Sequence, residues 1–336
     1  WQIDIFGGIT NAKRRAKAVY AESEEYQQAV RVQLISAIAN YYYTLLMLDG
    51  QHEATRLVAA SLDSSAETMR ALMEGGMANA AGVAQIEAAA YDAHATLLDI
   101  EHSIVAVESS LCALLGDAPH SIERGTLDEQ QMPEELCIGV PVSLLSRRPD
   151  VRIAEYRLMQ AHYATAAARS QLYPTLTLSG LLGWTNNVGS IVTNPGGLIL
   201  SAAASLTAPI FNSGKLRAQV RIAEAQREEV MLAFEQSLLN AGSEVNTALS
   251  QVQTARQKLQ LRTSQVEALA KAAEATQLLM DYGSTTYLEV LTAQQSLLAG
   301  QIAAISDRFD EIQGCVNLYI ALGGGSEREE SREQDK

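Results

Sequence analysis

The apolar positions of residues 279–323 repeat every seven residues. Two stripes follow this period, one made of Leu291, Leu298, Ile305, Ile312 and Tyr319, the other of Ile302, Phe309 and Val316. A seven-residue apolar period is typical of a coiled-coil seam, along which one helix packs against another. The pattern therefore predicts a long helix paired with a neighbouring helix.

An earlier stretch, residues 72–116, repeats this segment without a gap at an offset of 207. Matched identities include Leu72 with Leu279, Val83 with Val290, Leu111 with Leu318, and Gly116 with Gly323. A repeat of this length indicates two copies of one structural unit. Each copy opens with Met, an acid and a nearby glycine, which predicts a tight turn between two antiparallel helices.

Two proline-free stretches precede these turns. Residues 10–73 contain Gly50 as their single glycine, and residues 215–281 contain only Gly242. As continuous helix, the first would extend roughly 95 Å at about 1.5 Å per residue. We expect two long helices of similar length, with a kink or short interruption at Gly50.

Strands are predicted where apolar and polar residues alternate, at residues 1–6, 175–185 and 198–211. The two longer strands have the length that a tilted membrane-barrel strand requires. Trp1 and Trp184 stand at strand ends, as a membrane girdle of aromatic residues would place them. These features favour barrel strands over the alternative, a soluble sheet packed on a core.

The remaining segments complete a division into four regions. We predict a first repeat over 1–115, a surface connection over 116–142 that lies folded against the helices, a second repeat over 143–325, and a charged disordered tail over 326–336. Within the second repeat, Pro149 and Asp150 favour the start of a helix that ends near Tyr173 and Pro174.

Composition excludes several classes of function. Asp and Glu number 39 against 25 Lys and Arg, a net charge of −14, which argues against a nucleic-acid surface. The three cysteines and five histidines form no metal-ligand spacing, and no nucleophile elbow or phosphate loop is present. We therefore predict no enzyme, no cofactor and no metal.

Neither a membrane-spanning helix nor a signal peptide is expected from the sequence. No run of 18 apolar residues occurs, and the sequence begins at Trp1 inside a predicted strand. We expect an export or lipidation signal, and a fourth strand, to precede Trp1, so that this sequence alone would not complete a barrel.

Several motifs together resemble the TolC-like outer-membrane factors of Gram-negative bacteria, in particular their efflux lipoprotein branch. The resemblance covers residues 1–325 and rests on FGG before a long helix, LLSRRPDVRIAE, SQLYPTLTLSG, IFNSGKLRA and YGSTTYLEVLTAQQSLL with LYIALGGG. It implies a mainly α fold with a membrane β-barrel portion. Duplicated strand–long helix–helix hairpins would form a trimeric α-helical tube topped by a 12-stranded barrel.

The resemblance also implies where a gate would lie. By position, Glu289 matches the first acidic ring of the family's inner gate, Thr292 stands where a second acid is usual, Met280 stands in place of a tyrosine and Thr285 in place of an arginine. The family's charged latch is thus largely absent from this sequence.

In its place, we expect Asp281 and Tyr282 to line the closed end, because three symmetry-related acids would form a ring that favours cations. An alternative of nearly equal weight is that Asp281 and Glu289 are solvated turn residues. Helical tips of a periplasmic adaptor are expected to dock on Ala78, Val83, Ser284, Thr285 and Tyr287.

The favoured function is a passive duct in the outer membrane, extending into the periplasm, for a tripartite multidrug efflux pump. Its expected partners are two further copies of the chain, a periplasmic adaptor, an inner-membrane pump of the RND type and outer-membrane lipid. Two alternatives remain: the duct of a type I protein secretion system, and a soluble coiled-coil scaffold. The sequence names no substrate.

Overall fold

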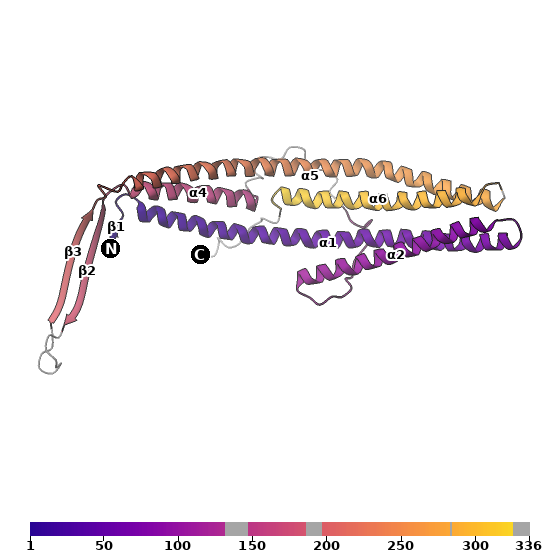
Figure 1. Cartoon of the computed structure of the whole chain (residues 1–336), viewed down its shortest axis with the longest axis horizontal. Helices are drawn as coiled ribbons and strands as arrows, with labels where there is room; N and C mark the ends of the chain where they lie inside the picture. Colours follow the sequence, from indigo (N-terminus) through magenta and orange to yellow (C-terminus); the bar gives the residue numbers. More distant parts are fainter. Residues whose placement is uncertain (132–146, 186–196, 283, 325–336) are drawn as a thin grey trace, which may run out of the picture. The chain divides into compact units, whose positions relative to one another are not determined.

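The part of the chain that the structure describes is built from five helices and three strands. They follow one another in the order β1, α1, α2, α4, β2, β3, α5 and α6 (Figure 1). The structure is a computed structural model and describes residues 1–131, 147–185, 197–282 and 284–324.

The chain divides into two compact units, each assembled from two separate stretches of sequence. Unit 1 consists of Trp1–Val30 and Val142–Ala241, and unit 2 of Arg31–Pro141 and Gly242–Lys336. The two longest helices contribute to both units: α1 (Gly8–Glu74) and α5 (Lys215–Asp281), each of 67 residues. Each unit therefore combines elements from both halves of the sequence.

The helices reproduce the 207-residue offset of the sequence repeat. Gly8 and Lys215, the first residues of α1 and α5, lie 207 positions apart. The same offset separates the starts of α2 (Ala80–Leu115) and α6 (Tyr287–Ala321). The predicted pair of long helices, each followed by a return helix, is therefore confirmed.

The turn before each long helix is also repeated. Gly7 and Gly214 precede α1 and α5 with φ of 76° and 75°, a left-handed conformation that only glycine adopts without strain. Before α1, the carboxylate of Asp4 accepts hydrogen bonds from the backbone N–H groups of Ile9 at 3.0 Å and Thr10 at 2.6 Å. These bonds satisfy donors of the first helical turn.

The three strands form one antiparallel sheet in the order β1–β2–β3. β2 (Thr175–Thr185) has the predicted bounds and pairs along its whole length with β3 (Gly197–Thr207). The prediction that the last strand continues to residue 211 is wrong. Its register ends where Thr207 meets Thr175, because Pro174 lies directly before β2 and Pro209 has no N–H to continue a ladder.

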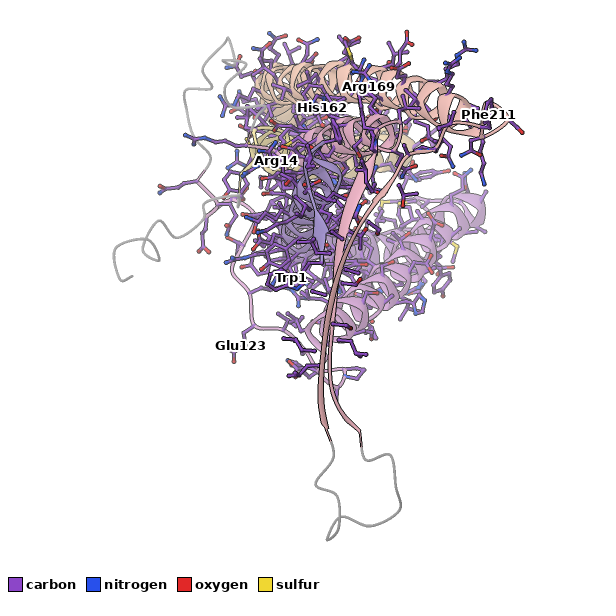
Figure 2. All side chains as sticks on the ribbon, turned by 90° about the vertical axis from the view of Figure 1, so that its left-hand side faces the viewer. Trp1, Arg14, Glu123, His162, Arg169 and Phe211 are labelled. Atoms are coloured by element: carbon purple, nitrogen blue, oxygen red, sulfur yellow. The ribbon has the colours of Figure 1, made fainter. Side chains whose placement is uncertain are left out.

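The first strand is shorter than predicted. β1 contains only Gln2–Ile3, which pair with Thr177 and Leu176, and the predicted strand over residues 1–6 is wrong in its extent. Asp4 and the residues after it are recruited to the start of α1 instead. Figure 2 labels Trp1 and Phe211, whose side chains are 96% and 98% exposed.

In unit 1, polar contacts fix α4 (Pro149–Ser170) to both long helices. Arg157 reaches Glu22 of α1 at 2.9 Å, and Arg169 reaches Glu224 of α5 at 2.6 Å. The buried hydroxyl of Thr165 donates to the carbonyl of Ala223 in α5 at 3.0 Å. The helix starts at Pro149 as predicted.

In unit 2, apolar clusters hold the helices together. One cluster joins α1, α2 and α6 through Val58, Ala59, Leu62, Ala90, Ala93 and Leu291. α1 passes through Gly50 without a break, so the predicted interruption there is wrong. A Cβ added at Gly50 would lie 3.4 Å from the Ile305 side chain of α6, which shows how closely that side chain approaches.

Most of the predicted seam is buried or partly buried. Leu291 and Ile312 of α6 are buried, and so are Val83, Ala90 and Leu111 of α2, which follow the same seven-residue spacing in the earlier copy of the repeat. Tyr319 is the exception, because its side chain is more than half exposed near the end of α6.

The connection after α2 is held against the helices of unit 2 by Arg124, whose side chain is 12% exposed. The guanidinium of Arg124 donates to both carboxylate oxygens of Asp49 at 2.5 and 2.8 Å and to Glu108 at 2.5 Å. Burial raises the pKa of Glu108, but hydrogen bonds from Arg124 and from the backbone of Ile122 outweigh it and hold the pKa below its ordinary value. Residues 132–142 of the predicted connection lie outside the described residues.

Buried carboxylates also join α6 to α5 within unit 2. Asp307 accepts a hydrogen bond from Arg262 at 2.9 Å. One turn later, Glu311 is held between Arg256 at 2.9 Å and Arg308 at 2.5 Å. Both acids are buried, and their paired cations compensate the cost of removing them from water.

The described residues contain neither a disulfide nor a metal-binding cluster. Cys112 and Cys315 are free thiols, and Cys137 lies outside the described part of the chain. No group of three or more His, Cys, Asp or Glu residues within that part could hold a metal ion. A search of the same residues finds no helix with the length and apolar character needed to cross a membrane.

Candidate functional site: the ends of the two helical hairpins

The first hairpin end is a tight, capped turn between α1 and α2. Gly76 has φ of 73°, and the N–H of Met77 donates to the carbonyl of Leu72 at 2.8 Å. Asn79 then caps α2, its side-chain oxygen accepting from the N–H of Gly82 at 2.8 Å. The turn therefore has a fixed geometry.

Replacing Asn79 by alanine is expected to lower the free energy of unfolding by about 1 kcal/mol, the ordinary effect of losing a helix N-cap. The matched control is Thr286→Ala at the equivalent position before α6, where the side chain makes no capping hydrogen bond. Urea denaturation of both variants measures the difference. Equal losses for the two would show that the Asn79 cap contributes nothing particular.

The second hairpin end is more polar and less tightly capped. Tyr282 follows α5 with its side chain 82% exposed, and the N–H of Ser284 donates to the carbonyl of Leu279 at 2.8 Å. The hydroxyl of Thr285 donates to the carboxylate of Glu289, which lies exposed in the first turn of α6. This end therefore presents an aromatic ring and an acid to its surroundings.

The two ends contact each other through Tyr287 and Met280 of the second hairpin. Tyr287, the first residue of α6, packs with Met280 against a buried cluster of Ala66, Met69, Val83 and Ile86 in the first hairpin. Its hydroxyl donates to the side-chain oxygen of Gln85 at 2.6 Å. A Cβ added at Gly82 would lie only 2.7 Å from the Tyr287 ring. Gly82 is therefore required for this contact.

Both hairpin ends lie in stretches with very few positive charges. No Lys or Arg occurs in residues 71–107 or 272–307, although both stretches contain acids, among them Glu74 in the first and Glu274, Asp281 and Glu289 in the second. The one arginine just before the first stretch, Arg70, is paired with Glu87 at 2.7 Å. A wall with these residues attracts cations and repels anions.

A polar groove lies between the helices of unit 2 near these ends. It has a volume of about 590 Å³, and its walls include Ser61, Ser64, Ser65 and Thr68 of α1. Gln294 of α6 is buried there and donates to Ser61 at 3.0 Å, while its side-chain oxygen has no partner among the described residues. A polar wall of this kind suits contact with water.

Comparison with known proteins agrees with this arrangement of helices and strands. Residues 1–117 and 140–324 match the family described as outer membrane efflux protein. The chain belongs to the outer membrane efflux protein family. It is therefore an exit duct rather than an enzyme, and its place is the outer membrane of a Gram-negative bacterium.

Two relatives of this outer membrane efflux protein are named as outer membrane proteins of export or efflux systems. The pyoverdine export outer membrane protein OpmQ of Pseudomonas aeruginosa is 31% identical over 332 residues, covering 97% of this chain and 68% of the relative. The toluene efflux pump outer membrane protein TtgC of Pseudomonas putida is 28% identical over 333 residues, and the match covers 97% of this chain and 67% of the length of TtgC.

A solved structure shows the same fold. The outer membrane protein VceC of Vibrio cholerae superposes with a TM-score of 0.87 and 26% identity, over 97% of this chain and 78% of that one. The mainly α fold with a helical tube and a barrel, expected from the sequence, is confirmed at this level.

The residues expected at the gate differ from one another in their exposure and in their hydrogen bonds. Tyr282, Glu289 and Thr292 are exposed, and the Thr292 hydroxyl donates to the carbonyl of Leu288 at 2.8 Å. Asp281 is the last residue of α5, and its side chain lies outside the described residues. Thr285 is bonded to Glu289 rather than free.

Among the residues expected to dock an adaptor, two are engaged within the chain. Val83 is buried in the first hairpin, and Tyr287 is packed on Gly82, so these side chains are not open surface. Ala78 is partly buried against the same cluster, whereas Ser284 is exposed.

For the membrane girdle, only one of the two tryptophans can be placed. The Trp1 side chain is exposed, and that of Trp184 lies outside the described residues.

Sequence reasoning missed the contact between Gly82 and Tyr287. The two residues lie in different copies of the repeat, and neither belongs to the seven-residue stripe that indicated pairing. A signal was nevertheless present, because a glycine near the start of a helix rich in alanine suggests that something approaches its backbone closely.

Proposed function

We propose that this outer membrane efflux protein forms a homotrimeric exit duct for an RND-type multidrug pump, and that its second hairpin end narrows the duct at rest. The observation that carries the proposal is the exposure of Tyr282, Glu289 and Thr292 in a stretch without positive charge. In a trimer, each exposed acid becomes a ring of three, which lowers the energy of a passing cation.

Neutralising the acids of the second end is expected to reduce selectivity for cations. In Asp281→Asn combined with Glu289→Gln, each subunit loses two negative charges from the proposed constriction. Reversal potentials in planar bilayers under a KCl gradient would then shift toward zero, while the channel stays open to small ions.

The control is Glu267→Gln, which removes an exposed acid of α5 two turns or more before the hairpin end. Its reversal potential is expected to match that of the unmodified protein. Unchanged selectivity in the double variant would contradict the proposed ring and would leave both acids as solvated turn residues.

A periplasmic adaptor is proposed to dock beside the hairpin ends, handing over substrates released by an inner-membrane pump. Ser284 and the partly buried Ala78 offer the small polar and apolar surface that a helical tip needs, and Thr285 directly follows Ser284 in the chain. Val83 and Tyr287 pack inside the protein, so they stabilise the proposed docking surface without being part of it.

The four-region division also remains a proposal. The repeats over 1–115 and 143–325 are supported by the shared offset of their helices, with 116–142 as the connection between them and 326–336 as the tail. Two barrel strands, β2 and β3, belong to the second repeat, with Trp1 and Trp184 proposed as girdle residues at the membrane boundary.

A further inference from the structure

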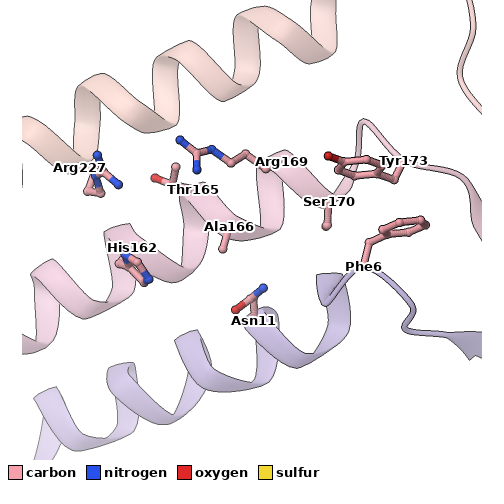
Figure 3. Close-up of a pocket in the computed structure, with 9 residues that line it drawn as sticks. All are labelled: Phe6, Asn11, His162, Thr165, Ala166, Arg169, Ser170, Tyr173 and Arg227. Atoms are coloured by element: carbon pink, nitrogen blue, oxygen red, sulfur yellow. The ribbon is translucent and has the colours of Figure 1, made fainter.

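A second cavity lies in unit 1, where the strands meet the helices. It has a volume of about 420 Å³, and α1, α4 and α5 contribute to its walls (Figure 3). Nine residues line it: Phe6, Asn11, His162, Thr165, Ala166, Arg169, Ser170, Tyr173 and Arg227. None of the nine is acidic, although the chain as a whole carries a net charge of −14.

Two arginines from different helices supply the positive charge of this cavity. Arg169 of α4 is paired with Glu224, which neutralises part of its charge. Arg227 of α5 is half-buried and makes no ion pair with the described residues. A guanidinium without an acid partner at the wall of a cavity attracts an anion, and a phosphate accepts its hydrogen bonds best.

The neighbouring groups suit a phosphate as well. The amide of Asn11 and the ring nitrogens of His162 are the further polar groups that reach the cavity from α1 and α4 (Figure 3). The hydroxyl of Thr165 donates to the carbonyl oxygens of Ala161 at 2.9 Å and Ala223 at 3.0 Å. These bonds hold Thr165 in place in the cavity wall.

An aromatic pair closes the end of the cavity nearest the strands. The rings of Phe6 and Tyr173 are stacked, with centroids 4.6 Å apart. Phe6 follows β1 by three residues, and Tyr173 precedes β2 by two. In outer-membrane proteins, aromatic rings at strand ends lie at the level of the lipid headgroups.

We propose that this cavity binds a phosphate group, carried either by a membrane phospholipid or by a soluble phosphate ester. Arg227 supplies the principal charge, Arg169 and Asn11 add hydrogen bonds, and the aromatic pair contacts the apolar part of the ligand. Basic pockets at a membrane boundary recognise phospholipid headgroups through these interactions. The site is independent of the hairpin ends and of how they close.

The test is a titration of the delipidated whole chain in a neutral detergent, followed by native mass spectrometry. The probes are dihexanoyl phosphatidylglycerol and glycerol 3-phosphate. For Arg227→Gln, the dissociation constant is expected to rise at least about tenfold, because a charge-assisted hydrogen bond is lost. The matched control, Arg217→Gln, removes an exposed arginine of α5 that does not line the cavity and should leave binding unchanged.

Two comparisons make the outcome decisive. Tighter binding of the phosphatidylglycerol supports a lipid as the source of the phosphate, and equal binding of both probes supports a soluble ester. A second variant, Ala166→Asp, places an acid in the cavity wall and is expected to abolish binding of both. The proposal is overturned if either cavity variant binds like the unmodified protein, or if Arg217→Gln weakens binding as much as Arg227→Gln does.

Discussion

Replacing Gly82 by valine is expected to separate the two hairpin ends and to raise the resting conductance of the duct. A Cβ at this position would lie 2.7 Å from Cε1 and 2.9 Å from Cζ of Tyr287, and 3.2 Å from the end of Met69. Such overpacking typically costs about 1–3 kcal/mol, and the tyrosine ring can relieve it only by moving away. Because Tyr287 begins α6, this movement loosens the end that we propose narrows the duct.

Single-channel recording in planar bilayers measures this effect. Gly242→Val is the matched control, since Gly242 is also a helical glycine but has nothing within 4 Å of an added Cβ. Adding Tyr287→Ala to Gly82→Val removes the clash and should restore thermal stability in part, a non-additivity expected of residues in contact. Equal conductance for the two valine variants would show that this contact does not restrain the duct.

Replacing Arg124 by methionine is expected to cause the largest loss of stability in unit 2. The change leaves the buried carboxylate of Glu108 without its cation and breaks three hydrogen bonds to Asp49 and Glu108. Removing one partner of a buried ion pair typically costs roughly 3–5 kcal/mol. We expect the low end of that range, about 3 kcal/mol, because Asp49 still reaches solvent.

Urea denaturation followed by circular dichroism measures the loss. The control is Arg56→Met, which breaks an exposed pair with Glu53 on the same helix and should change stability little. Adding Glu108→Gln to Arg124→Met removes the stranded charge and should recover part of the loss. If the two arginine variants were equally stable, Arg124 would have no special role in holding the connection.

The order and type of the helices and strands could be predicted because they follow from the sequence repeat and from local patterns of apolar and polar residues. Proline-free stretches predicted α1 and α5, and alternation predicted the bounds of β2. Errors arose where a local pattern competed with a contact elsewhere. Asp4 alternates like a strand residue but caps α1, and Gly50 resembles a break but lies against Ile305 in a continuous helix.

The candidate site was predictable in position but not in its contacts. The repeat indicated two hairpin ends, and Tyr282 and Glu289 were expected at the second of them. It did not indicate that Tyr287 packs on Gly82, or that Arg124 joins residues 16 and 75 positions away. Such contacts depend on how elements meet in space, and no local period in one sequence records them.

The distances along the chain between bonded residues also set an order of assembly. Arg70 and Glu87 are 17 residues apart, so the first hairpin can close as soon as both its helices have formed. Trp1 bonds Leu178 across 177 residues, and Arg157 meets Glu22 across 135. β1 can therefore pair with β2 only after more than half of the chain has followed it. Before then, the backbone groups of β1 remain available for pairing with another strand.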